Sequence, residues 1–526
     1  MAVDQASELA LLARQLEELN AIGAALAAER DTTRLLDLIL TKARDITSSD
    51  AGSLYLAEPL GEAGAQGDEP KQVLRFAIAQ NDSGDVPFLT TTLEITDASI
   101  AGHVALTGEP VRLDDAYSLP ARVPYTLNRS FDQSTGYRTQ SVLAVPMKTP
   151  KGAIVGVVQL INAKRGRAIV PYSDRQQSLA VSLASQAAVA VENSHLYAEI
   201  QKLFEGFVRA SVIAIEARDP ATSGHSFRVA NLTVAFAESV DRAEGGCYAH
   251  VRFSREEMRT IRYASLLHDF GKVGVREEVL VKAKKLYPAQ LELIRERFKL
   301  ARRSREMKGL QDRLDFLLAN GRHAYLARLG DFDVGLADEL TALERALGAV
   351  EAANEPSVLP DGTFERLQEL ARIEFLDADG SPRPLLHDEE VRLLSLRKGS
   401  LSEGERVQIE SHVLHSYRFL QQIPWTREIR HVPAIAVGHH EKLNGTGYPH
   451  QLAARQIPVQ TRMMTISDIF DALAAADRPY KKAVPIERAL HILELAVKDG
   501  ELDADLFRLF VDARVFDRWQ VEPYPY

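Results

Sequence analysis

Apolar residues recur at intervals of three and four along the first segment of the chain, from residue 5 to about residue 46. The first of these positions are Leu9, Leu12, Leu16, Leu19, Ile22 and Leu26. This spacing places them on one face of a helix, so the segment is predicted to be helical with a single apolar stripe. Such a stripe packs either on the domain that follows it or on a second copy of the chain.

Short β-like runs replace this pattern in the region that ends near residue 175. The runs SLYLAE, VLRFAIA, SVLAVPMK and AIVGVVQLINA are separated by polar loops, with one helical piece near SIAGHVALTG. A small α/β domain is therefore expected. From residue 175 to about residue 217 the pattern is helical again and contains no proline, which predicts one long connecting helix.

Beyond residue 217 the β signal almost vanishes and helical patterns dominate. Only His103 and His195 precede Gly224, and the other histidines follow it. Residues 284 to about 392 are charged and helical, with two loop-like parts, and are predicted to form an insertion with its own packing unit. The abundance of charge in the insertion favours a solvated helical surface.

Composition narrows the setting in which the chain works. Its 526 residues exceed one core, so two or three domains are expected. No apolar run approaches the roughly 18 residues that span a bilayer, and Cys247 is the only cysteine, which excludes internal disulfides. A cytoplasmic location is expected. The net charge of −10 gives no attraction for DNA or for an anionic membrane.

The pair His268-Asp269 ends an apolar helical run, just before Gly271. An adjacent imidazole and carboxylate can ligate one metal or bridge two. Alone, this dipeptide is more often structural than catalytic. The other ligand-type residues on helical segments are His225, His412, His439, His440 and Asp468. Because burying so many unpaired imidazoles is costly, their convergence in one all-α core predicts a metal site.

These segments together resemble the HD-GYP phosphodiesterases, a branch of the metal-dependent HD-domain phosphohydrolases. The resemblance is carried by HDFGK from His268, the His412 segment, HHEKLNGTGYP from His439 and SDIFDALAAADRPYKK. It covers about residues 210 to 500, interrupted by the insertion. The resemblance implies an all-α HD-type domain that hydrolyses cyclic di-GMP to pGpG, and in some members on to GMP.

The resemblance also assigns roles residue by residue. It implies two divalent ions, iron or manganese, with Asp269 bridging them. Lys272 is expected near the scissile phosphate, Arg478 and Lys481 are expected to bind phosphate, and Tyr448 is expected to pack in the GTGYP loop or to contact the substrate. The implied metal ligands are His225, His268, Asp269, His412, His439, His440 and Asp468.

Three positions depart from the family pattern. Asn444 stands where the family commonly has Asp, and Ser416 stands where it commonly has Gly. Ala221 occupies the place of the glutamate that holds a third metal in some relatives, so a centre of two metals is expected. Glu216 and Asp219 are the alternative ligands for a third ion.

Residues from about 33 to 193 resemble a GAF domain, a small-molecule sensor fold. The resemblance rests on SIAGHVALTGEPVRLDDAY, FDQSTGYRTQSVLAVPMK and GAIVGVVQLINAK. Asn162 and Lys164 remain from the NKFDE-type signature of cyclic-nucleotide-binding members, but the phenylalanine of that signature is absent from its expected place. A cyclic nucleotide is a minority interpretation and a haem on His103 less favoured still, so the small ligand of this domain stays unknown.

The expected protein is multidomain, with an α/β GAF sensor domain and an all-α HD-type domain joined by a long helix. The expected boundaries are an N-terminal helix at 1–32, the GAF domain at 33–193 and the HD-GYP domain at 194–526, with the insertion at about 284–392. Two functions stay open, a cyclic di-GMP phosphodiesterase regulated by its GAF domain and a non-catalytic cyclic dinucleotide receptor. The complete ligand set with Lys272 favours the enzyme, and the apolar stripes favour a homodimer.

Overall fold

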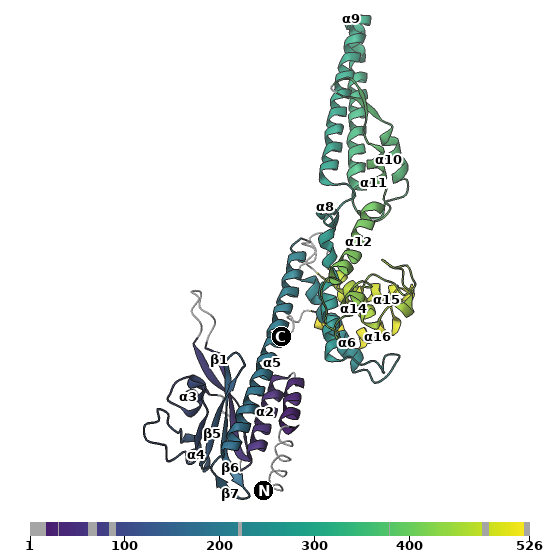
Figure 1. The fold of residues 1–526 in the computed structure, drawn as a ribbon. Coiled ribbons are helices and arrows are strands. Elements are labelled where there is room, and N and C mark those ends of the chain that lie inside the picture. The colour runs from purple at the N-terminus through teal and green to yellow at the C-terminus, as the bar shows by residue number, and fades with distance from the viewer. Residues whose placement is uncertain are drawn as a thin grey trace. The chain divides into compact units, whose positions relative to one another are not determined.

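The computed structural model describes residues 17–29, 31–60, 71–83, 91–218, 224–377, 379–475 and 483–519. The chain forms two compact units, residues 1–205 and residues 206–526, coloured from purple to yellow in Figure 1. Within the described ranges, no helix is both long enough and apolar enough to cross a bilayer.

A seven-stranded antiparallel sheet forms the centre of the N-terminal unit. Six strands follow the spatial order β3-β2-β1-β6-β5-β4, and β7 pairs with β6. The strands are β1 (Ser49–Pro59), β2 (Gln72–Asn81), β3 (Thr92–Glu94), β4 (Val111–Leu113), β5 (Val142–Lys148), β6 (Ile154–Arg165) and β7 (Ala168–Val170).

The two faces of this sheet are covered by different helices, as alternating side chains require. In β5, Leu143 and Val145 belong to a core shared with helices α2 (Thr32–Thr47) and α5 (Asp174–Glu216). Val142 and Ala144 belong to a second core with α3 (Ile100–Thr107). The short helix α4 (Ser130–Thr135) lies between β4 and β5 in the sequence. The predicted α/β domain with a long following helix is therefore present, and α5 is 43 residues long.

The predicted single helix from residue 5 to residue 46 is wrong over its described part. Residues 17–28 are helical, the helix stops, and α2 begins at Thr32. Asp31 causes the new start, because its carboxylate accepts a hydrogen bond from the Arg34 amide at 3.0 Å and caps α2. Residues 5–16 lie outside the described part of the chain.

Helices build the C-terminal unit around an apolar core that includes Phe236, Phe470 and Phe510. The described α-helices that follow α5 in this unit, apart from those of the hairpin below, are α6 (His225–Asp241), α7 (Arg255–Leu267), α8 (Glu277–Leu280), α12 (Glu403–Leu420), α13 (Val432–Ala436), α14 (Val459–Ala474), α15 (Ile486–Lys498) and α16 (Ala504–Asp512). Of these, α6, α7, α14, α15 and α16 contribute to the core. The described part of the unit also contains short 3₁₀ helices, η2 (Phe270–Gly274), η3 (Ala454–Gln456) and η4 (Val515–Arg518).

A helical hairpin interrupts this unit between α8 and α12 (Figure 1). Helix α9 (Pro288–Ala353) reverses at Gly321, whose φ of 79° and ψ of 171° are not helical. Ion pairs then cross the hairpin in antiparallel register, Arg295 with Glu351 and Arg302 with Glu344. The segments α10 (Thr363–Ala371), β8 (Glu374–Leu376), β9 (Pro382–Pro384) and α11 (Asp388–Leu394) complete it. Its core is separate from that of the other helices.

Candidate metal centre

Five segments of the C-terminal unit bring the predicted ligand residues together. His268 and Asp269 follow the end of α7, and His225 is the first residue of α6. His412 lies in α12, His439 and His440 follow α13, and Asp468 lies in α14. Their ligand atoms form two groups, His412 with His439 and His440, and His225 with His268 and Asp269, each within 4.8 Å.

Asp269 lies between the two groups and presents one carboxylate oxygen to each. Its Oδ1 is 3.2 Å from His412 Nε2 and 4.0 Å from His439 Nε2. Its Oδ2 is 3.5 Å from His268 Nε2 and 3.7 Å from His225 Nε2. Asp468 Oδ1 adds a contact of 3.2 Å to His225 Nε2. This arrangement is what a carboxylate that bridges two ions requires.

Backbone carbonyls fix the orientation of three of the histidines. The Nδ1 atoms of His268, His412 and His439 lie 2.7, 2.5 and 2.6 Å from the carbonyl oxygens of Ser265, Ile409 and Ala436, each three residues earlier. A carbonyl only accepts, so each Nδ1 carries the hydrogen and each Nε2 presents a lone pair to the cluster.

The Nε2 atoms of these three histidines carry no hydrogen, so they cannot donate hydrogen bonds to one another. His412 Nε2 lies 3.4 Å from His439 Nε2, and the buried His268 Nε2 has no hydrogen-bond partner among the described residues. Two facing acceptors repel, and an unsatisfied buried nitrogen is costly, unless a cation lies between them. The donor set, imidazole nitrogens with carboxylate oxygens, suits iron, manganese or zinc.

The protonation of the cluster is consistent with metal ligation. Burial lowers the pKa of His440 to about 4, and burial with neighbouring imidazoles holds the pKa of His439 well below its usual range. Burial opposes ionisation of Asp269, but Lys272 and the nearby imidazoles outweigh it and hold the Asp269 pKa well below its ordinary value. Neutral imidazoles and ionised carboxylates are the forms that bind metal.

His225 is the exception to this pattern. Burial lowers its pKa, but the carboxylates of Asp468 and Asp471 outweigh burial and raise the pKa to about 9. Without an ion, His225 therefore keeps a proton on Nε2 at neutral pH, and metal binding would release that proton.

The predicted substrate-binding residues divide into described and undescribed positions. Lys272 Nζ lies 2.9 Å from Asp269 Oδ2, at the edge of the cluster. The Tyr448 ring lies against His440, with 4.8 Å between ring centroids. Arg478 and Lys481 lie outside the described residues.

Glu441 fixes the loop that follows the two adjacent histidines, a role that the sequence analysis missed. Its carboxylate accepts hydrogen bonds from the His450 amide at 2.6 Å and the Leu452 amide at 2.9 Å. Gly447 is required there, because a Cβ would lie 2.4 Å from the Lys442 nitrogen. The signal that could have found Glu441 is its place next to His440, where a carboxylate is available to fold the loop back.

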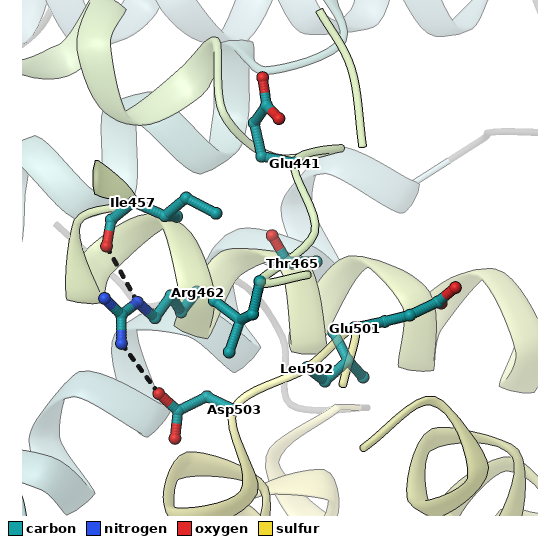
Figure 2. Close-up of a pocket in the computed structure, with 8 residues that line it drawn as sticks. Glu441, Ile457, Arg462, Thr465, Glu501, Leu502 and Asp503 are labelled. Atoms are coloured by element: carbon teal, nitrogen blue, oxygen red, sulfur yellow. Dashed lines mark hydrogen bonds and ion pairs between the residues drawn. The ribbon is translucent and has the colours of Figure 1, made fainter. Parts of the chain in front are cut away.

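A small cavity next to this loop is lined by Glu441 and by none of the predicted metal ligands (Figure 2). Arg462 crosses its wall, donating to the Ile457 carbonyl at 2.9 Å and pairing with Asp503 at 3.0 Å. Thr465 donates to the His439 carbonyl at 3.0 Å, which supports the ligand from behind. The paired polar groups indicate a structural support and not a substrate site.

One of the departures from the family pattern, Ser416, has a local explanation, and Glu216, a possible ligand of a third ion, has another role. Ser416 is fully buried, accepts from the Gly271 amide at 2.7 Å and donates to the His268 carbonyl at 2.7 Å, so it ties the His-Asp turn to α12. Glu216 accepts from the amides of Gly224 at 2.7 Å and Ser226 at 3.0 Å, which caps α6. Asp219 and Ala221 lie outside the described residues.

Comparison with known families agrees with this arrangement. Residues 31–191 match the GAF domain family, and residues 222–343 and 389–506 match HD domain families. A GAF domain of an Acinetobacter phosphoenolpyruvate-protein phosphotransferase matches with 20% identity and a TM-score of 0.27, covering 35% of this chain and 95% of that one. The family matches to a GAF domain and to HD domains confirm the predicted fold class.

Curated relatives match shorter segments. A 3'3'-cGAMP-specific phosphodiesterase of Vibrio cholerae is 39% identical over 98 residues, 19% of this chain. A cyclic di-GMP phosphodiesterase of Pseudomonas aeruginosa is 35% identical over 121 residues, 22% of this chain. The matched segments span 20% and 27% of those relatives' own lengths.

The two HD matches share one centre. The first contains His225, His268 and Asp269, and the second contains His412 and Asp468. Contacts of 3.2 Å join the two sets, from His412 to Asp269 and from His225 to Asp468. Fold and site define a helical histidine–aspartate domain of metal-binding type. Residues 222–343 and 389–506 match HD domain families, and residues 31–191, which match the GAF domain family, precede them.

Proposed function

We propose that the chain is a metal-dependent phosphodiesterase that opens a cyclic dinucleotide. The observation that carries this proposal is the position of Asp269, with one oxygen facing each of two histidine groups. A receptor needs a pocket for the nucleotide, whereas buried Nε2 lone pairs around a shared carboxylate are what a hydrolytic metal pair needs.

The seven predicted ligands would hold two divalent ions, iron or manganese. When bound, such ions lower the pKa of a water molecule and stabilise negative charge on the departing oxygen. Asp269 would bridge them, with His412, His439 and His440 on one side. On the other side would be His225 and His268, with Asp468 beside His225.

Lys272 and Tyr448 would act on the substrate. The Lys272 ammonium, 2.9 Å from Asp269 Oδ2, would stabilise negative charge on the scissile phosphate or on the leaving oxygen. Burial raises the pKa of Tyr448, so its hydroxyl stays neutral and can donate a hydrogen bond to a phosphate or a base. Arg478 and Lys481 are proposed to bind phosphate of the substrate.

The proposed substrate class comes from the relatives. One is named for 3'3'-cGAMP and another for cyclic di-GMP, and both compounds are cyclic dinucleotides. We propose cyclic di-GMP as the substrate, cut to pGpG, with the mixed dinucleotide as the alternative. The cytoplasmic location expected from the composition belongs to the same proposal.

The test is chromatography of each cyclic dinucleotide after incubation with the full chain and Mn²⁺, or with Fe²⁺ under anaerobic conditions. Linear product is expected from the unaltered protein and not from Asp269→Asn. His431→Ala is the matched control, because His431 is exposed and lies outside the cluster. Saturable nucleotide binding without product from the metallated protein would refute the enzyme and support the receptor.

We also propose that the chain forms a homodimer. In this dimer, ligand binding to the GAF domain would change the activity of the HD region through α5. Leu196, Ile200 and Leu203 leave 48%, 63% and 75% of their surface exposed, at spacings typical of a coiled-coil seam. Ile200→Glu with Leu203→Glu is expected to halve the mass measured by light scattering. A dimer of unchanged mass would contradict this seam.

A further inference from the structure

His225 differs from His268, His412 and His439 in what holds its Nδ1. His268, His412 and His439 each use a carbonyl one helical turn earlier. His225 is the first residue of α6, so no preceding turn of that helix supplies such a carbonyl. Its Nδ1 instead lies 2.7 Å from Asp471 Oδ2.

Asp471 is itself held from several sides. It is fully buried, and Arg228 donates to both of its oxygens, at 2.7 Å from Nε and 3.1 Å from Nη2. The Trp519 indole nitrogen also donates to its Oδ1. These donors leave the carboxylate one orientation, with Oδ2 aimed at the imidazole.

Helix α14 supplies both carboxylates that contact His225. Asp468 and Asp471 are three residues apart, and such positions lie on the same face of a helix. Asp468 reaches Nε2 at 3.2 Å and Asp471 reaches Nδ1 at 2.7 Å. One helix of the HD core therefore contacts both nitrogens of the His225 imidazole and orients the ring.

We propose that Asp471 is a positioning residue for the metal centre, acting through His225. A carboxylate that accepts the Nδ1 hydrogen fixes the tautomer, fixes the ring and makes Nε2 a stronger donor, whereas a carbonyl does this more weakly. His225 is thereby more electron-rich than His268, His412 and His439, which use carbonyls. This inference rests on the proposed metal centre, and it concerns a residue outside the predicted ligand set.

A purely structural role for Asp471 makes a different prediction. Arg228 and Trp519 also use this carboxylate to join α6, α14 and η4, so its loss lowers stability in either case. Metal affinity and the electronic spectrum of a bound ion distinguish the two roles. Trp519→Phe is the matched control, because it removes one contact of Asp471 and leaves the contact with His225.

The experiment is a titration of the metal-free full chain with Co²⁺, followed by calorimetry and by the visible absorption bands of the ion. Asp471→Asn is expected to weaken Co²⁺ binding about 10- to 100-fold at one of two sites and to shift the bands. Trp519→Phe is expected to lower the Tm without either change. Asp471→Glu, which keeps the carboxylate, is expected to recover part of the affinity.

Other outcomes overturn the inference. It fails if Asp471→Asn binds Co²⁺ like the unaltered protein, or if Trp519→Phe weakens binding equally. If the Asn variant does not fold, an unchanged affinity in Asp471→Glu overturns it, because the longer side chain moves the oxygen away from Nδ1. Absence of Co²⁺ binding by the unaltered protein overturns the proposed function as well, whereas an unresponsive Asp471 overturns the inference alone.

Discussion

Each of the two units buries a carboxylate in a polar cluster, and the two clusters are built in opposite ways. In the GAF domain, Asp50 is 3% exposed and is surrounded by donors. Tyr137 donates its hydroxyl at 2.7 Å, Ser83 donates at 2.7 Å, and Lys164 forms an ion pair. In the HD core, Asp269 is 7% exposed and faces imidazole lone pairs, with Lys272 as its one lysine partner among the described residues.

We call a polar cluster closed when hydrogen-bond donors of the protein satisfy its carboxylate, and open when some of its buried polar atoms lack a partner. Burial raises the pKa of Asp50, but the hydrogen bonds from Lys164 and Tyr137 outweigh it, so the net shift is downward and the charge is satisfied within the protein. The cluster around Asp269 is open, because buried imidazole nitrogens beside it, such as His268 Nε2, have no partner among the described residues and would be satisfied by a cation. A buried carboxylate surrounded by donors, like Asp50, is satisfied within the protein, whereas one beside imidazole nitrogens that lack a partner, like Asp269 beside His268 Nε2, indicates a candidate site.

This contrast also explains two residues of the GAF domain. Asn162 and Lys164 are what remains of a cyclic-nucleotide signature in the sequence. In the structure, Asn162 donates to the Tyr137 hydroxyl at 2.9 Å and to the Arg138 carbonyl at 2.8 Å, and Lys164 pairs with Asp50. Both side chains are used within the fold, so their presence does not argue for a bound nucleotide.

Metal removal is the strongest way to break the comparison. An ion present at 100 times its Kd stabilises the folded state by about 2.7 kcal/mol, so losing two ions is expected to cost the HD core about 5 kcal/mol. Calorimetry before and after chelation measures this, with the GAF transition expected to stay in place. Equal shifts of both transitions, or none, would contradict an open cluster confined to the HD core.

Asp50→Asn tests the closed cluster. The change removes the ion pair with Lys164 but keeps an acceptor for Tyr137. Because the Lys164 side chain is 35% exposed and can be solvated, we expect a loss of about 2 kcal/mol in the free energy of unfolding of the GAF domain. Denaturant titration followed in the GAF domain measures it, and metal content is expected to be unchanged.

The matched control for that change is Asp82→Asn. Asp82, like Asp50, forms an ion pair, in this case with Arg44, but the Asp82 side chain is 64% exposed. An exposed pair contributes about 0–1 kcal/mol, so the control is expected to change stability little. If Asp50→Asn costs no more than Asp82→Asn, the cluster around Asp50 is not the structural element described above.

The sequence predicted the longer elements and not the shortest ones. The four β-like runs correspond to β1, β2, β5 and β6. Strands β3, β4 and β7 have three residues each, too few to show a period of two, and they form because a neighbouring strand offers free backbone groups. The break between residues 28 and 32 was missed because the apolar stripe outweighed the Asp31 cap.

The candidate ligands were predicted from motifs, but their supports were not. His268 and Asp269 belong to a recognisable pair, whereas Asp471 looks like any acidic residue on a helix. Its role depends on Arg228 and His225, more than 200 positions away in the sequence. Local patterns carry no information on such contacts, so the residues that orient the ligands emerge only from the fold.

The smallest expected effect concerns a third carboxylate in a polar cluster, Glu405, which is only partly buried. Glu405, at the start of α12, accepts from Lys282 at 2.8 Å and from the Tyr287 hydroxyl at 2.6 Å, where the hairpin leaves the HD core. Burial raises its pKa, but Lys282 and Tyr287 outweigh burial and lower the pKa to about 2. By the rule above, this cluster is closed and structural.

The sign of the pH effect follows from that shift. Because the folded pKa lies below the ordinary value of 4.5, the ionised carboxylate stabilises the fold above pH 4.5, and this stability is lost as the pH falls towards 2. Glu405→Gln is expected to lack about 1 kcal/mol of this pH dependence, after allowance for partial solvation. Unfolding of the metal-free protein between pH 5 and about pH 3 measures it, with the exposed Glu403→Gln as control. If the unaltered protein, Glu405→Gln and Glu403→Gln show equal pH slopes, Glu405 does not contribute the expected pH-dependent stability. Helix α12 also carries His412, two turns after Glu405. A changed metal content of Glu405→Gln at pH 7 would therefore show that Glu405 affects the metal centre and does not have a purely structural role.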